Sequence, residues 1–62
     1  MMRMTPEQLK KHREKSEMTQ KQIAEELELS LRFWQYREWG VRDIPRWLAR
    51  AVRDLVRNPN RP

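Results

Sequence analysis

Residues 18–40, MTQKQIAEELELSLRFWQYREWG, decide the fold of this chain. Thr19 and Gln22 have the spacing of a capping box, in which two residues three apart satisfy each other's backbone at a helix start. Ser30 is a second residue of the N-cap type, and Gly40 is the kind of residue that ends a helix in the left-handed conformation. The stretch therefore predicts two helices joined by a turn of about three residues, which forces them to cross sharply.

Caps and prolines delimit the helices of the whole chain. The central stretch predicts helices over residues 20–28 and 31–39. A threonine–proline start predicts a helix over residues 6–16. An amphipathic stripe predicts another over residues 45–57, and its apolar members are Ile44, Trp47, Leu48, Ala51, Val52, Leu55 and Val56. No segment alternates as a strand does, and residues 58–62 have the composition of a frayed tail. The sequence predicts an all-α fold in which the whole chain is a single four-helix domain.

The composition excludes several classes of function. The chain has 62 residues, no cysteine and one histidine, His12, so we expect no disulfide, no metal site and no cofactor. No apolar run approaches the roughly 18 residues of a membrane span, and no signal peptide is apparent, so we expect a cytoplasmic protein. We expect neither a small-molecule substrate nor an enzyme, because no nucleophile–base pair is visible. His12 is expected at the surface or boundary of its helix.

The net charge of +5 lies entirely in the second half of the chain. Residues 1–31 hold six basic and six acidic residues, whereas residues 32–62 hold eight arginines and three acids, together with all five aromatic residues. The planar guanidinium group of arginine suits bidentate contact with phosphate or guanine. The pattern favours a surface that binds a polyanion, most simply nucleic acid. The alternative is a solvated arginine surface around an aromatic core.

Spaced residues along most of the chain match a known pattern. They are Thr19, Gln20, Ile23, Ala24, Leu27, Leu29, Ser30, Glu38 and Gly40, with Leu9, Arg13, Ile44 and Pro45 on either side. With these residues the chain resembles the Cro/C1 (lambda-repressor-like, Xre) helix-turn-helix family over about residues 5–57. The resemblance implies a four-helix domain that inserts its third helix into the major groove of double-stranded DNA.

The resemblance also implies two sets of DNA-contacting residues. The expected base contacts are Leu31, Arg32, Phe33, Gln35 and Tyr36. The expected phosphate contacts are Gln20, Lys21, Ser30, Arg42 and Arg46. Arginine can pair with guanine, glutamine with adenine and an apolar side chain with the thymine methyl group, while helix N-termini suit phosphates. Core packing is the alternative for the aromatic members, and capping or solvation is the alternative for the polar ones.

Other matching residues imply structural roles. Arg13 and Glu38 match a pair that joins the first and third helices in the family, so we expect a structural salt bridge, and Trp34 matches a buried position. The stripe of the last helix is wider than one small core needs, which predicts a homodimer. The expected dimer interface is Trp47, Val52, Leu55 and Val56.

The chain departs from the family pattern at three places. Glu28 stands where the family has a turn glycine, and a left-handed backbone there would cost about 1 kcal/mol. Arg37 occupies a position that is usually apolar. The third helix is bulky and aromatic where small polar residues are usual.

These observations predict a sequence-specific transcriptional regulator. We expect a dimeric repressor that binds an inverted-repeat operator near its own promoter. Small single-domain proteins of this kind resemble phage or mobile-element regulators, among them anti-CRISPR-associated autorepressors. Two alternatives stay open. One is an architectural or recombination accessory protein that binds nucleic acid without strong sequence choice, and the other is a protein-interaction module that uses the aromatic helix.

Overall fold

The computed structural model describes residues 3–57, with side chains as far as residue 55. Its helices are α1 (Pro6–Lys15), α2 (Gln20–Glu26), α3 (Leu31–Glu38) and α4 (Arg46–Arg57). Residues 3–57 contain these four helices and no strand, so the all-α prediction is confirmed for this part of the chain. No helix within it is long and apolar enough to span a membrane. The predicted tail lies outside the described residues.

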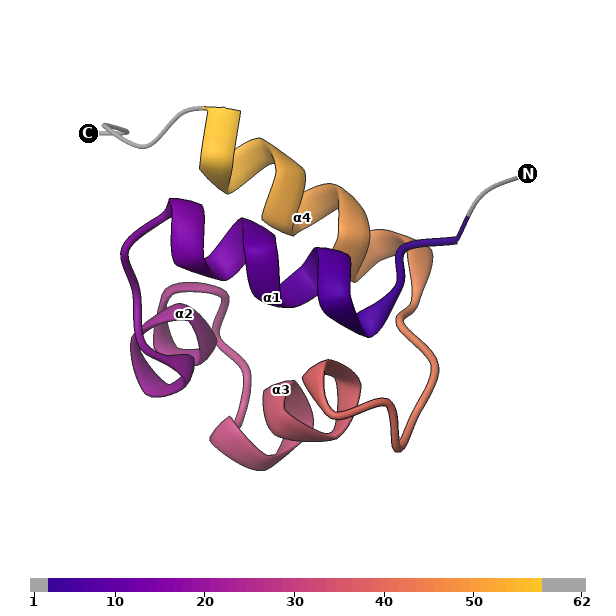
Figure 1. Cartoon of the computed structure of the whole chain (residues 1–62). Coiled ribbons are helices and arrows are strands. Elements are labelled where there is room, and N and C mark those ends of the chain that lie inside the picture. The colour runs from indigo at the N-terminus through magenta and orange to yellow at the C-terminus, as the bar shows by residue number, and fades with distance from the viewer. Residues whose placement is uncertain (1–2, 58–62) are drawn as a thin grey trace.

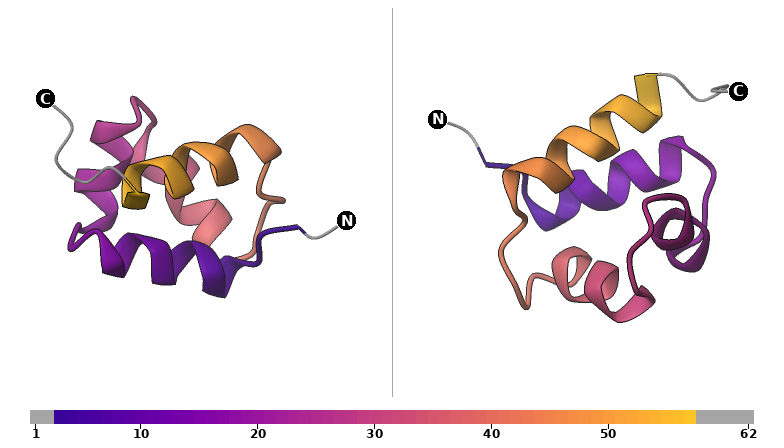
Figure 2. Two further views of the ribbon diagram at one scale, coloured as in Figure 1. Left: turned by 90° about the horizontal axis from the view of Figure 1, so that it is seen from above. Right: turned by 180° about the vertical axis from the view of Figure 1, so that it is seen from behind.

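The four helices form two layers. Figure 1 shows α4 beside α1 in one layer and α2 beside α3 in the other, and the views of Figure 2 agree. α1 contacts both α4 and α3, while α2 contacts α3. The outer surface of α2 and α3 therefore lies on the opposite side of the molecule from the outer surface of α4.

The first three helices begin at the predicted caps. Thr5 Oγ1 accepts a 3.1 Å hydrogen bond from the backbone N–H of Gln8, whose Oε1 accepts one of 3.0 Å from the N–H of Thr5. Thr19 and Gln22 form the same capping box at α2, with bonds of 3.1 and 2.9 Å. Ser30 Oγ caps α3 by accepting from the backbone N–H three residues on. These bonds satisfy helix N–H groups that have no partner within the helix.

α3 ends in a Schellman motif. The backbone N–H of Gly40 donates to the Arg37 carbonyl at 3.3 Å, and that of Val41 donates to the Tyr36 carbonyl at 2.9 Å. Gly40 has a φ of 80°, the left-handed conformation that this motif requires. The predicted role of Gly40 as the residue that ends the helix is confirmed.

α1 and α2 end in the same motif with glutamate in place of glycine. Glu17 and Glu28 have φ values of 57° and 59°. At α2, the N–H of Glu28 donates to the Glu25 carbonyl at 3.1 Å, and that of Leu29 donates to the Ala24 carbonyl at 2.7 Å. The backbone at Glu28 is left-handed, and each of the two glutamates carries a conformational cost of about 1 kcal/mol. α2 consequently ends at Glu26, short of the predicted 28.

All four helices contribute to one core. Its largest fully buried side chains are Leu9, Ile23, Trp34, Leu48 and Val52. Met4, Ala24, Ala49 and Leu55 complete the buried set. Burying an aliphatic side chain of this size contributes about 1.5–3 kcal/mol, which is substantial for so short a chain.

The buried face of α4 differs from the predicted stripe. It consists of Leu48, Ala49, Val52 and Leu55, whereas Trp47 keeps 52% of its surface exposed. Ile44, predicted as part of the stripe, lies before the helix, which begins only at Arg46. α4 therefore packs with the small Ala49 side chain toward the core, and the large Trp47 ring lies at the surface.

Candidate nucleic-acid interface

The carboxylate of Glu38, at the end of α3, accepts hydrogen bonds from three other side chains. Arg13 Nε donates to Oε1 at 2.8 Å, and Arg13 Nη2 donates to Oε2 at 3.3 Å. Trp34 Nε1 donates to Oε1 at 2.9 Å, and Gln20 Nε2 donates to Oε2 at 2.8 Å. Glu38 thereby joins α1, α2 and α3, and the expected pair of Arg13 and Glu38 is present.

The Arg13–Glu38 pair is shielded from water. The two side chains are only 15% and 5% exposed. Burial by itself raises the pKa of Glu38, but the hydrogen bonds from Arg13, Trp34 and Gln20 and the charge of Arg13 outweigh it and hold the pKa below its ordinary value. Arg13 Nη1 also donates to the Met18 carbonyl at 3.0 Å, which ties the α1–α2 loop to the same site.

Gln20, expected at a phosphate, and Gln35, expected at a base, are hydrogen-bonded to each other. Gln35 Nε2 on α3 donates to Gln20 Oε1 on α2 at 3.2 Å, while the amide nitrogen of Gln20 is held by Glu38. Both glutamine side chains are half-buried. The start of α2 and the middle of α3 are therefore held together by a chain of hydrogen bonds that ends on a buried carboxylate.

Exposed residues surround this glutamine pair. Lys21 is exposed in the first turn of α2, and Ser30 is exposed at the cap of α3. Leu31 is 39% exposed and Arg32 is exposed in the first turn of α3. We call Gln20, Lys21, Leu31, Arg32 and Gln35 the α2–α3 surface. Because residues three or four apart share a helix face, Leu31 and Arg32 lie beside Gln35 on α3.

Phe33 is engaged in packing rather than presented on this surface. Its ring stacks on Trp47 of α4, with centroids 5.8 Å apart and planes 28° apart. The guanidinium carbon of Arg37 lies 3.7 Å from the Phe33 ring centroid, and Phe33 also packs against the core. We therefore correct the predicted base contact at Phe33: its ring links α3 to α4.

The contacts of Arg37 and Tyr36 in α3 were not predicted from the sequence. The Nε atom of Arg37 is buried and has no hydrogen-bond partner within the described residues. Its stack on Phe33 supplies the contact that an apolar residue would otherwise make, and the four-residue spacing of the pair was the available signal. Tyr36 is half-buried, and its backbone carbonyl accepts from Val41 and Arg42.

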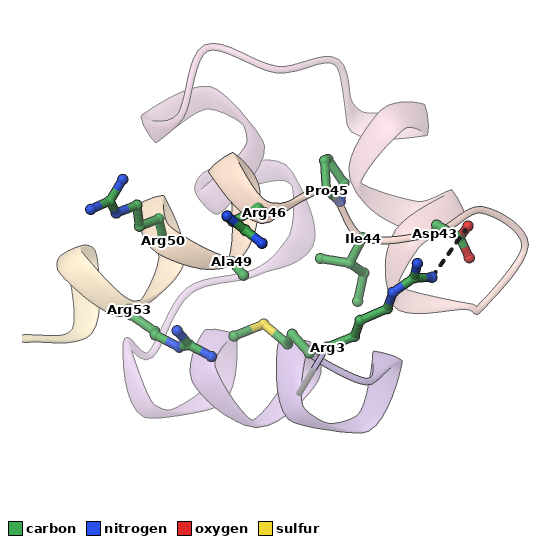
Figure 3. A pocket seen from close by; sticks show the side chains of 9 residues that line it. Arg3, Asp43, Ile44, Pro45, Arg46, Ala49, Arg50 and Arg53 are labelled. Carbon is green, nitrogen blue, oxygen red and sulfur yellow. Dashed lines mark ion pairs between the residues drawn. The ribbon is translucent and has the colours of Figure 1, made fainter. Parts of the chain in front are cut away.

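The two arginines predicted for phosphate contact lie in different surroundings. Arg42 is exposed in the loop after α3. Arg46 is exposed at the start of α4 and lines a groove with other arginines of that helix (Figure 3). The structure thus groups Arg46 with α4 and not with the α2–α3 surface.

The expected dimer interface is wrong at two positions. Val52 is fully buried and Leu55 is 5% exposed, because both fill the core of the single chain. Trp47 is the exposed member of the set, and the side chain of Val56 lies outside the described ones. Leu48, Val52 and Leu55 of the α4 stripe are thus used by the core of one chain, whereas Trp47 is not.

Within residues 3–57, no group of His, Asp or Glu side chains is arranged to hold a metal ion. His12 is half-buried, and its Nδ1 atom has no hydrogen-bond partner in that range. Burial, followed by the charges of Lys15 and Arg53, lowers its pKa below 6.5. The expected boundary position of His12 is what the structure has.

No protein-family model, curated protein or solved structure matches this chain. What the chain does must therefore be inferred from its own surfaces.

Proposed function

We propose that this chain is a sequence-specific DNA-binding regulator of transcription, built on a helix-turn-helix and acting as a repressor. The hydrogen bond between Gln20 and Gln35 carries the proposal, because it joins the start of α2 to the middle of α3, the two helices on which Lys21 and Arg32 are exposed. Glu38 and Arg13 hold this pair in place from below. A surface that is fixed before binding loses little conformational entropy when it meets DNA.

Reading of bases falls to α3 in this proposal. Arg32 is exposed one residue after the helix start, where its planar guanidinium can reach O6 and N7 of guanine. Leu31 beside it offers an apolar contact for a thymine methyl group, and Gln35 suits adenine. Tyr36 contributes its partly exposed edge. Phe33 is left out, because Trp47 and Arg37 engage its ring.

Phosphate contacts would position the reading helix. The N-termini of α2 and α3 direct backbone N–H groups outward, and Gln20, Lys21 and Ser30 stand at or beside them. Arg42 adds a charge in the loop that follows α3. A net charge of +5 on 62 residues supports attraction to a polyanion at long range.

Two copies on an inverted repeat would give the specificity that one small domain lacks. The reading helices of such a dimer would lie about 34 Å apart, one turn of the duplex. Among the expected dimer-interface residues whose side chains are described, Trp47 is the one with half of its surface exposed. The promoter of the chain's own gene is the first operator to test.

Fluorescence anisotropy with the duplex upstream of the chain's own gene, against a scrambled duplex at physiological salt, tests the proposal. A preference of about 10³-fold or more that Arg32→Ala strongly reduces would support it. Arg53→Ala is the matched control, because Arg53 is an exposed arginine on α4. Equal, steeply salt-dependent binding to both duplexes would instead favour an architectural nucleic-acid-binding protein.

A second candidate function is suggested by exposed apolar residues after the end of α3. Trp39 is 60% exposed and Val41 is 61% exposed. An exposed tryptophan with an apolar neighbour is a typical centre of a protein–protein contact. If neither duplex binds, a protein-interaction module centred on these two residues becomes the leading function.

A further inference from the structure

An open groove of about 910 Å³ runs along α4 (Figure 3), which lies in the other layer of the molecule from α2 (Figure 1). Its walls come from the N-terminal segment, from the loop before α4 and from α4 itself, and no residue of α2 or α3 lines it. The groove therefore shares none of its residues with the α2–α3 surface, and its possible role is independent of DNA reading.

The rim of the groove is strongly basic. Arg46, Arg50 and Arg53 lie at helical spacing along α4, and Arg3 lies across the groove on the N-terminal segment. Among the described residues that line the groove, Asp43 is the only acid, and it lies 4.0 Å from Arg3 with its side chain 95% exposed. An exposed pair at this distance contributes little and leaves the rim positive.

The floor of the groove is apolar. Met4 and Ala49 are 7% and 8% exposed, and Ile44, in the loop before α4, is half-buried. Figure 3 shows the side chains of Ile44 and Ala49 between Arg3 on one side and the α4 arginines on the other. Apolar atoms thus line the base while guanidinium groups line the edge, which is the arrangement of a hydrophobic centre with a charged border.

We propose that this groove is the docking site for an acidic, amphipathic peptide segment of a partner protein. Carboxylates of such a segment would meet the guanidinium groups of Arg46, Arg50 and Arg53, and arginine binds carboxylates well because its fork is planar. The apolar side chains of the segment would lie on Met4 and Ile44. A chain bound to DNA through α2 and α3 would still present the groove to this partner.

The positive rim and the apolar floor of the groove together favour an acidic amphipathic segment over a second copy of the chain and over nucleic acid. A second copy of the chain would bring a second set of α4 arginines against the first, and like charges in one interface oppose association. A nucleic-acid backbone would satisfy the arginines but would leave the apolar floor without a contact. An acidic amphipathic segment uses both the rim and the floor.

The test uses three labelled probes with the full chain. They are a short peptide in which glutamates alternate with leucines, a polyglutamate peptide of equal charge, and a short DNA duplex of random sequence. Anisotropy gives each affinity, and amide chemical-shift mapping on the ¹⁵N-labelled protein gives the site. We expect the amphipathic peptide to bind most tightly among the peptides and to shift the amides of residues 43–53.

Paired variants separate the rim from the floor. Arg50→Glu with Arg53→Glu should weaken the amphipathic peptide about tenfold or more, whereas Lys10→Glu with Lys11→Glu, an equal charge change at exposed positions of α1, should not. Ile44→Ser should weaken the amphipathic peptide and leave polyglutamate unchanged. Circular dichroism checks that each variant folds, and the shift map of the unaltered chain does not depend on the variants.

Several outcomes would overturn the proposal. They are equal affinity for the two peptides, shifts confined to α2 and α3, displacement of the peptide from α4 by the random duplex, or no binding of either peptide. A failure of the chain to bind its own operator would not affect this result, because the peptide measurements need no DNA. Conversely, operator binding that Arg50→Glu with Arg53→Glu leaves intact would separate the two surfaces.

Discussion

The guanidinium of Arg13 on α1 lies 2.8 Å from the carboxylate of Glu38 on α3, and this contact organises the surface above it. Glu38 holds Gln20, and Gln20 holds Gln35, so an ion pair in the interior fixes two side chains at the exterior. Breaking the pair should therefore change both the stability of the domain and the presentation of the glutamines.

Glu38→Gln should lower the free energy of unfolding by about 3 kcal/mol, because it leaves the buried Arg13 charge unpaired. Glu14→Gln, a change at an exposed glutamate of α1, should stay within about 0.5 kcal/mol. Urea denaturation followed by circular dichroism measures both. Equal losses for the two variants would show that the Arg13–Glu38 pair contributes no more to stability than an exposed glutamate does.

Acid should destabilise the domain in two stages. His12 has a folded-state pKa below 6.5, so its contribution is fully present above that value and is lost as pH falls below it. Glu38 also has a lowered pKa, so its contribution is present above 4.5 and is lost at lower pH. Thermal unfolding between pH 7.5 and pH 5.5 measures the first stage, and His12→Gln should remove it. A stability that is constant over that window would contradict the prediction.

Glycine should be stabilising at two helix C-termini, where the backbone has the left-handed conformation that glycine adopts most readily. Glu28→Gly and Glu17→Gly should each raise the free energy of unfolding by about 1 kcal/mol, because both residues have a positive φ. Each change also removes a negative charge from a helix C-terminus, where the helix dipole disfavours it. Glu25→Gly, inside α2, should instead lose about 1 kcal/mol. Denaturant midpoints of the three variants provide the comparison.

The α4 residues first expected between two copies should behave as core residues. Leu55→Ala should cost about 2–5 kcal/mol, because it empties space in the interior of one chain. The loss should be the same at low and high protein concentration. Unfolding at several protein concentrations measures this. A loss of stability that grows on dilution would show that Leu55 lies at an intermolecular interface.

Phosphate and base contacts should separate in a salt titration of operator binding. Log K for a dimer that makes about eight phosphate contacts should fall with log salt at a slope of roughly −7. Arg42→Ala should make the slope shallower by about one per chain and leave the preference for the operator unchanged. Arg32→Ala should reduce the preference by about 1–3 kcal/mol per half-site. The reverse assignment of these two effects would require a different reading helix.

Local chemistry explains how much could be predicted from the sequence alone. Thr5, Thr19 and Ser30 accept hydrogen bonds from backbone groups within three residues, and Gly40 adopts a conformation that few other residues favour, so the helix boundaries follow from neighbours in the chain. The pairing of Arg13 with Glu38 was expected only through a resemblance, because 25 residues separate them.

Tertiary structure decided what each face of a helix is used for. Periodicity placed Trp47 and Val52 on one stripe, but the rotation of α4 against α1 buried Val52 and left Trp47 to stack on Phe33. The same packing removed Phe33 from the α2–α3 surface and gathered the arginines of α4 around a groove. Caps and turns are determined by contacts between residues close in sequence, whereas the exposure of a side chain depends on helices that meet only after the chain has folded.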